Sequence, residues 1–215
     1  MAGVIKVDRV QSDSNLAFNI AGANVAFMDA SALQMVGSNI AVGGTNVITS
    51  GKVVRTGMPV GSVLQVVQTV KTDTFTTTTS GGTFVDITGL SVTITPTSTT
   101  NKILVMVDVA TGAGGSVAAE TRLVRNSTVI YGGDTAGSRS NGLSQAFTGS
   151  DYYTWRNGGI YLDSPTTTSA TTYKIQLQAS AGGTAVYVNR SYSDRDTAGY
   201  DLRTASSITV MEIAA

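Results

Sequence analysis

The sequence predicts an all-β protein, in which a short segment of strands and turns (residues 1–58) precedes a jelly-roll-like antiparallel β-sandwich (residues 59–215). The first observation is composition: the chain has 32 Thr, 22 Ser, 24 Gly and 12 Asp but only 2 Glu. Thr favours strands, Gly and Asp favour turns, and Glu is a good helix former. The second observation is that no segment sustains a helical apolar period beyond about three turns. Thirdly, apolar runs from residue 62 onward follow one another at the spacing of a sandwich.

The first segment repeats a loose motif in which Asn precedes aliphatic and small residues. The four copies are NLAF, NVAF, NIAV and NVIT, which begin at Asn15, Asn24, Asn39 and Asn46. Their irregular spacing excludes a solenoid of fixed period. Because the segment has no second layer to bury these runs, we expect three copies to wind around a shared axis. The alternatives are an irregular arm along the sandwich of the same subunit and a short helical turn at residues 26–36.

Nine apolar runs are predicted to form the strands of the sandwich. They cover residues 62–70, 83–95, 101–111, 119–133, 144–155, 158–164, 171–180, 184–192 and 206–214. The run at 119–133 is expected to fold into two strands about Asn126 and Ser127. This number of strands is typical of a double-sheet jelly roll.

Strand alternation predicts which faces are buried. The run at 171–180 places Tyr173, Ile175 and Leu177 on one face and polar residues on the other, as a strand with one solvated face does. The runs at 101–111 and 206–214 instead carry apolar residues on both faces. A strand of this kind is buried on both sides, so its outer face is covered by another subunit or by another layer. We expect another subunit of a homotrimer. The predicted interface residues are Leu104, Met106, Met211 and Ile213.

The composition excludes several function classes. The chain has no Cys and no His, which removes disulfides, Ser-His-Asp and Cys-His catalysis and almost every zinc site. Its formal net charge is zero, so neither nucleic acid nor an acidic membrane is an expected partner. No apolar run is long enough for a membrane span, and no targeting segment is recognised at the start. No cofactor is expected.

Three groups of residues are candidates for chemistry. Asp194, Asp196 and Asp201 lie close together but lack the Gly and Glu of a calcium-binding EF-hand loop, so a solvated loop is preferred. The GAGG sequence at 112–115 lacks the ending of a phosphate-binding loop and is interpreted as a connection between strands. Asp151 and Asp163 are the best candidates for a glycosidase carboxylate pair, although nothing in the sequence fixes their separation.

Aromatic residues concentrate in one part of the chain. Tyr152, Tyr153, Trp155 and Tyr161 fall within ten positions, and Arg156 lies between them. Aromatic faces beside Arg and Asn donors suit a carbohydrate receptor. The preferred alternative is structural, with Trp155 in the core and the tyrosines at a subunit interface.

Several stretches resemble small fibre-type structural proteins of tailed bacteriophages that infect aquatic bacteria, such as cyanophages. These stretches are MAGVIKVDRVQS, GMPVGSVLQVVQ, FVDITGLSVTITPTSTTNKILV, RNSTVIYGG, YLDSPTTTSATTYKIQLQ, VYVNRS and SSITVMEIAA. The resemblance covers most of residues 58–215, whereas the first sixty residues match only in style. It implies a trimeric jelly-roll knob carried by an N-terminal docking segment, and it transfers no functional residues.

The expected function is therefore structural rather than enzymatic. The resemblance implies a trimeric tail fibre of the virion, made in the host bacterial cytoplasm. Its N-terminal arm would dock to other virion proteins of the tail, baseplate or capsid, and its knob would attach to a host surface glycan. The alternative is a trimeric capsid decoration protein that stabilises the head.

Overall fold

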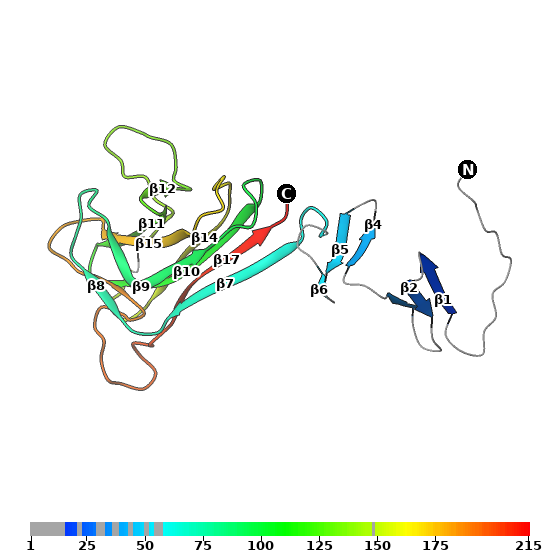
Figure 1. Cartoon of the computed structure of the whole chain (residues 1–215). Coiled ribbons are helices and arrows are strands. Elements are labelled where there is room, and N and C mark those ends of the chain that lie inside the picture. The colour runs from blue at the N-terminus through cyan, green and yellow to red at the C-terminus, as the bar shows by residue number, and fades with distance from the viewer. Residues whose placement is uncertain are drawn as a thin grey trace. The chain divides into compact units, whose positions relative to one another are not determined.

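The computed structural model describes the backbone of six strands between residues 16 and 53, and the chain over residues 58–147 and 149–215. These described residues form strands and no helix, so the all-β prediction is confirmed. It follows that the described part of the chain offers no helix of the length and hydropathy that a bilayer span requires. The chain divides into two units, Met1–Pro59 and Val60–Ala215 (Figure 1).

The first unit contains two antiparallel sheets of three strands each. They are β1 (Leu16–Ile20), β2 (Ala23–Met28) and β3 (Leu33–Met35), then β4 (Asn39–Val42), β5 (Thr45–Thr49) and β6 (Lys52–Val53). Each strand pairs with its neighbour along the chain, as short apolar runs separated by turn residues do. Since β2 and β3 occupy both ends of residues 26–36, the alternative of a helical turn there is wrong. Residues 1–15, the side chains of these strands and the predicted docking contacts lie outside the described residues, and the winding of three copies stays a prediction.

The second unit is built from two layers of antiparallel strands (Figure 1). The first sheet contains β7 (Val63–Lys71), β8 (Phe75–Thr77), β10 (Lys102–Ala113), β14 (Trp155–Asp163), β16 (Val186–Val188) and β17 (Ser206–Ile213). The second sheet contains β9 (Val85–Ile94), β11 (Ala118–Arg125), β12 (Thr128–Ile130), β13 (Ser144–Phe147) and β15 (Thr171–Ala179).

The strand order identifies the sandwich as a jelly roll. The first sheet has the path β7-β17-β10, with β14 on the other side of β10, and the second has the path β12-β11-β15-β9. Along the chain, successive long strands alternate between the sheets, from β7 to β9, β10, β11, β14, β15 and β17. This is the double Greek key of a jelly roll, so the predicted fold class is confirmed.

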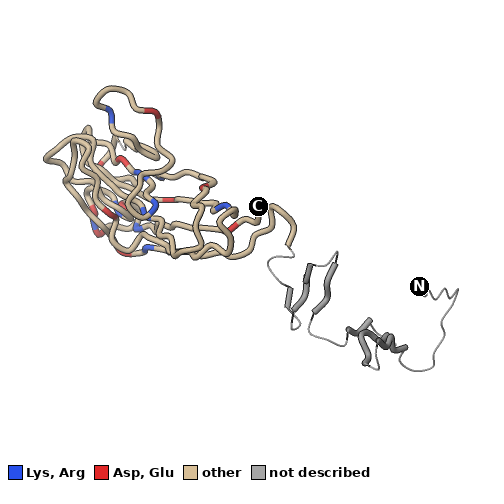
Figure 2. Tube along the Cα trace, turned by 45° about the horizontal axis from the view of Figure 1, so that its top comes forward, with Lys and Arg blue, Asp and Glu red and all other residues tan. Residues whose placement is uncertain are grey.

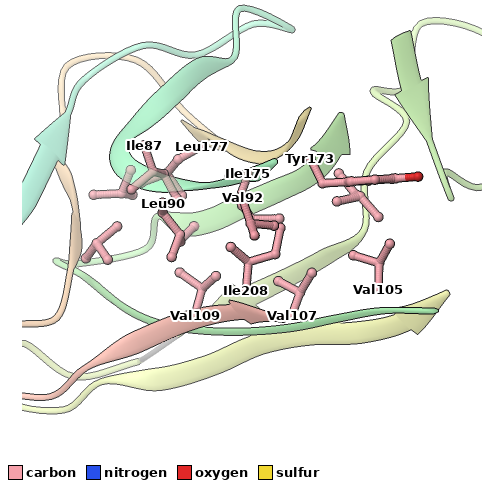
Figure 3. Packing of buried hydrophobic residues seen from close by; sticks show 14 of the residues in the cluster. Ile87, Leu90, Val92, Val105, Val107, Val109, Tyr173, Ile175, Leu177 and Ile208 are labelled. Atoms are coloured by element: carbon pink, nitrogen blue, oxygen red, sulfur yellow. The ribbon is translucent and has the colours of Figure 1, made fainter. Parts of the chain in front are cut away.

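The core lies between the two inner faces. Figure 3 shows Tyr173, Ile175 and Leu177 of β15 facing Val105 and Val109 of β10, and all five are fully buried. The predicted alternation of β15 and the predicted inner face of β10 are therefore confirmed. Burying an aliphatic side chain of this size contributes about 1.5–3 kcal/mol to stability, so the contacts between the sheets stabilise the sandwich.

Two predicted strands need correction, and one strand was not predicted. The run at 144–155 is not one strand, because β13 ends at Phe147 and β14 begins at Trp155. Gly149 between them has a φ of 60°, a left-handed conformation that ends a strand. Within the run at 184–192, only the three residues of β16 form a strand. The short strand β8 was not predicted, because its Thr-rich sequence has no apolar alternation. The turn at Asn126 and Ser127 is confirmed, since Arg125 pairs with Thr128 and Asn126 has a φ of 53°.

Candidate functional site

The outer face of the first sheet carries the residues predicted to form a trimer interface. Antiparallel register aligns Val66 with Met211, Met211 with Leu104, and Leu104 with Leu162. Directly opposite residues on neighbouring strands lie on the same face of a sheet. These four residues therefore form one apolar row that crosses β7, β17, β10 and β14.

A second row lies beside the first and extends the apolar surface. It aligns Gln68, Thr209, Met106 and Ile160. Met106 is 38% exposed and Ile160 is 61% exposed, although both are large apolar side chains. A shallow hollow of about 400 Å³ lies beside Met106 and Ile160. The six apolar members of the two rows, here called the outer apolar face, are Val66, Leu104, Met106, Ile160, Leu162 and Met211.

Polar pairs border the outer apolar face. Arg156 forms an ion pair with Asp108 (3.1 Å). Asp108 follows Met106 by two residues and therefore lies on the same face of β10. At the other end, the Lys102 Nζ donates a hydrogen bond to Ser164 Oγ (2.8 Å), and Lys102 is aligned with Ile213. Ile213 therefore lies at the border of the face rather than at its centre.

The sequence prediction missed three members of this face, Val66, Ile160 and Leu162. Successive side chains of a strand point to opposite faces, so every second residue of β7 and β14 shares the outer face. This period of two was the signal that could have identified the three residues. In β14, however, the adjacent Gly158 and Gly159 interrupt that pattern.

The predicted aromatic patch lies at the end of the sandwich where β14 begins. Tyr152 and Tyr153 are exposed, and Trp155 is 52% exposed. The alternative that placed Trp155 in the core is therefore wrong. Trp155 occupies the first position of β14, opposite Thr111, and is not a member of the apolar core.

Two of the five predicted patch residues lie elsewhere. Tyr161 is aligned with Val105, packs against the core and stacks on Tyr131 with ring centres 4.9 Å apart. Arg156 belongs to the border of the outer apolar face. β14 is nine residues long, and Trp155 lies at its start whereas Tyr161 lies near its end. These aromatic residues are therefore close in sequence but far apart along the strand.

Two residues that the sequence did not single out join the patch. The Arg195 guanidinium lies 4.0 Å from the ring centre of Tyr152 and 4.9 Å from that of Tyr200. The Arg195 Nε donates to Asp201 Oδ2 (2.7 Å), and Ser191 donates to the other oxygen of Asp201. The Ser191 hydrogen bond and the Arg195 ion pair lower the pKa of Asp201 below its ordinary value. We call Tyr152, Arg195 and Tyr200 the tyrosine–arginine cluster.

Two of the three aspartates that the sequence suggested as calcium ligands, Asp194 and Asp201, form ion pairs with arginines. Asp194 forms ion pairs with Arg190 (2.6 Å) and Arg203 (2.7 Å), and Asp201 forms one with Arg195. Over residues 58–147 and 149–215, no group of three acidic residues is placed to hold a metal ion. Asp194 and Asp201 therefore pair with arginine side chains, and Asp201 is buried, whereas the preferred prediction was a solvated loop with bonds from Asp to the backbone.

Asp151 and Asp163 do not form a carboxylate pair. Asp163 lies at the end of β14 and accepts two hydrogen bonds from Arg125 (2.8 Å each) and one from the Tyr173 hydroxyl (2.7 Å). Burial and this hydrogen bond raise the pKa of Tyr173. Asp151 precedes β14 and accepts from the Gly115 backbone N–H (3.2 Å). Since β14 spans about 25 Å, the two carboxylates lie too far apart for glycoside hydrolysis, which needs roughly 5–10 Å.

Comparison with known proteins finds similarity among solved structures but not among sequences. No protein-family model matches the chain, and no curated protein matches its sequence. Among solved structures, it is similar to T=1 particles derived from infectious bursal virus, with 9% identity, a TM-score of 0.36 and coverage of 88% of this chain and 49% of that chain. It is also similar to infectious bursal disease virus Gx strain, with 11% identity, a TM-score of 0.31 and coverage of 90% and 47%. A third match is the VP2 subviral particle of infectious bursal disease virus, with 10% identity, a TM-score of 0.29 and coverage of 87% and 50%.

The chain spans about half the length of the proteins in these structures. We draw no functional inference from these structural similarities. The assignment of the jelly roll rests on the strand order alone.

Proposed function

We propose that the chain is a non-enzymatic structural protein of a phage virion, and that it assembles as a homotrimer in which neighbouring copies cover the outer apolar face. The observation that carries the proposal is this face, where four apolar side chains form a row across four strands and Met106 and Ile160 extend it on β10 and β14. The virion context comes from the sequence resemblance to phage fibre proteins.

The anatomy of the outer apolar face favours a second copy of the chain as its occupant. Subunit interfaces combine an apolar centre with a polar border. Here the centre contains Leu104 and Met211, and the border contains the ion pair between Asp108 and Arg156. Identical copies bring the same uncharged centre to the contact, so their association buries no unpaired charge.

The exposed aromatic end supports a role in attachment to the host surface. The chain enters the sandwich at Val63, which pairs with Ile213, and Ile213 pairs with Lys102. Trp155 pairs with Thr111, nine residues further along β10, which corresponds to about 30 Å. The aromatic residues thus lie at the end of the sandwich far from the chain entry, where a knob held by its N-terminal arm is free to contact a glycan.

Sedimentation of the purified chain at low micromolar concentration tests the trimer. The wild-type chain is expected to sediment as a trimer, and Met106→Asp is expected to reduce association because burying an unpaired charge costs several kcal/mol. Val129→Asp is the matched control, since Val129 is also 38% exposed but lies on the other sheet. A stable folded wild-type monomer would contradict the proposal.

Adsorption to host cells tests the attachment function. Tyr153 is 61% exposed, so Tyr153→Ala is expected to change the free energy of unfolding by only about 0.5 kcal/mol. The same variant is expected to slow adsorption of particles. A large loss of stability with unchanged adsorption would instead assign Tyr153 to a subunit contact.

The alternative function is capsid decoration, which requires the same trimer but no receptor. Electron microscopy of virions labelled through the C-terminus separates the two functions. A few labelled copies near the tail support the fibre, whereas labels that cover the head support the decoration protein.

A further inference from the structure

The second sheet has a polar hollow of about 580 Å³ on its outer side. It lies between the loop at 131–143, the turn before β9 and the Arg122 side chain of β11. The loop follows β12 and returns to β11, where the Leu143 backbone N–H donates to the Thr121 carbonyl (2.7 Å). The hollow is therefore formed within a single chain, by a loop that is fixed at both of its ends.

The two arginines that line this hollow differ from the other arginines of the described chain. Figure 2 shows basic and acidic residues interspersed along the sandwich. Five of the seven arginines in residues 58–147 and 149–215 form ion pairs with aspartates. The remaining two, Arg122 and Arg139, have no carboxylate partner among the described residues, and both line the hollow.

Arg122 is held in place by direct contacts with neutral groups. Its Nε donates to Gln176 Oε1 (2.6 Å), and its guanidinium lies 4.3 Å from the ring centre of Phe84. Its two terminal nitrogens donate to no other described residue. Asp86 is close enough to influence Arg122, but its oxygens accept hydrogen bonds from Lys174 (2.7 Å) and Gln176 (2.5 Å).

The remaining lining residues supply neutral polar groups. Ser138, Ser140 and Asn141 line the hollow, and no Asp or Glu of the described chain does. Gln178, which does not line the hollow, donates from its Nε2 to Glu120 Oε2 (2.5 Å) and more weakly to Ser140 Oγ (3.4 Å).

We propose that this hollow binds an acidic saccharide, with the oxyanion of the ligand between Arg122 and Arg139. Guanidinium groups pair with carboxylate or phosphate oxygens through charge-assisted hydrogen bonds. The hydroxyl and amide groups of Ser138, Ser140 and Asn141 match sugar hydroxyls. A volume of about 580 Å³ lies within the range of small-ligand sites and exceeds the needs of a single phosphate ion. The proposal does not depend on the trimer or on attachment through the aromatic end.

Calorimetric titration of the full chain with D-glucuronate, D-glucose and inorganic phosphate tests the proposal. We expect glucuronate to bind in the millimolar range, neutral glucose to bind about tenfold more weakly, and added salt to weaken glucuronate binding. Arg122→Gln and Arg139→Gln are each expected to lower the affinity for glucuronate about tenfold. Arg203→Gln, which changes an exposed and ion-paired arginine of another loop, is the control and is expected to bind as the wild type does.

The outcomes separate the parts of the proposal. Arg139 lies exposed on the loop, so Arg139→Gln remains informative if Arg122→Gln fails to fold. Equal affinity for phosphate and glucuronate, lost in Arg139→Gln, would support an oxyanion site and overturn the saccharide. Undetectable binding of all three probes, or binding that neither arginine variant weakens, would overturn the proposal entirely.

Discussion

Glu212 and Asp163 are both buried carboxylates, but the sandwich stabilises their charges in different ways. Asp163 has a cation, Arg125, and the hydroxyl of Tyr173. Glu212 instead accepts four hydrogen bonds from neutral donors: Gln65 Nε2 (2.6 Å), the Thr97 N–H (2.6 Å) and hydroxyl (2.7 Å), and Asn101 Nδ2 (2.7 Å). No Lys or Arg of the described residues pairs with Glu212. These bonds attach the loop between β9 and β10 to β7 and β17.

Replacement of Glu212 by Gln is expected to destabilise the sandwich by about 2 kcal/mol at neutral pH, since hydrogen bonds to charged groups contribute roughly 1.5–3 kcal/mol. The amide of Gln would also direct two donors toward other donors. The free energy of unfolding in urea measures this effect. Asp134→Asn is the control, because Asp134 is an exposed loop residue.

The same site predicts a dependence on pH. Burial alone would raise the pKa of Glu212, but the hydrogen bonds from Asn101, Thr97 and Gln65 lower it below the ordinary value of 4.5. A carboxylate whose pKa is lower in the folded state than in the unfolded state stabilises the fold at any pH above the unfolded-state pKa. This contribution is lost as the pH falls from the unfolded-state pKa through the folded-state pKa. The difference in stability between the wild type and Glu212→Gln should therefore shrink below about pH 4.5. A difference that stays constant down to pH 2 would contradict this assignment.

At the scale of elements, β10 and the loop that follows β16 approach each other so closely at Gly112 that no side chain fits at this position of β10. A Cβ at Gly112 would lie 2.3 Å from the Arg190 carbonyl oxygen and 3.0 Å from the Ser191 Cα. Both are backbone atoms, so the loop cannot yield by rotating a side chain. The GAGG sequence predicted as a loop thus begins inside β10, and its first glycine permits this packing.

Gly112→Ala is therefore expected to destabilise the chain by about 1–3 kcal/mol or more, as overpacking does. Gly133→Ala is the matched control, because Gly133 has no atom within 4 Å of the added Cβ and its φ is not positive. That control should stay within about 0.5 kcal/mol of the wild type. Thermal unfolding of both variants compares them, and equal melting temperatures would contradict the close approach.

The elements that the sequence predicted best are those with regular alternation. Tyr173 and its neighbours in β15, and the two-sided apolar pattern of β10, follow from the period of a strand, which needs no knowledge of distant residues. The site was predicted only in part. The contact between Arg195 and Tyr152 joins two loops, and the pairing of Asp163 with Arg125 joins two sheets, so neither has a local sequence pattern. Trp155 was misassigned because aromatic residues are common both in cores and on surfaces.

At the scale of the whole molecule, the jelly roll closes without the first unit. Among residues 58–147 and 149–215, the buried members of the apolar core cluster lie between Ile87 and Val210. The bonds that join the start of β7 to the end of β17, Gly61 N–H to Ala214 O (2.8 Å) and Ala214 N–H to Ser62 O (2.9 Å), also lie inside the second unit. The sandwich therefore has its own core and its own closure.

A chain shortened to Val60–Ala215 is therefore expected to fold and to melt within a few degrees of the full chain, but to fail to incorporate into particles. A second deletion, which begins the chain after Lys71, provides the contrast. It removes β7, so that β17 becomes an edge strand and the apolar contact of Val67 with the core is lost. Loss of a whole strand removes more than the few kcal/mol that hold most domains folded, so this shorter chain is expected to unfold. Circular dichroism and thermal melting distinguish the two. If the chain beginning at Val60 also unfolds, the first unit contributes to the core, and the division of the molecule at Pro59 does not separate docking from folding.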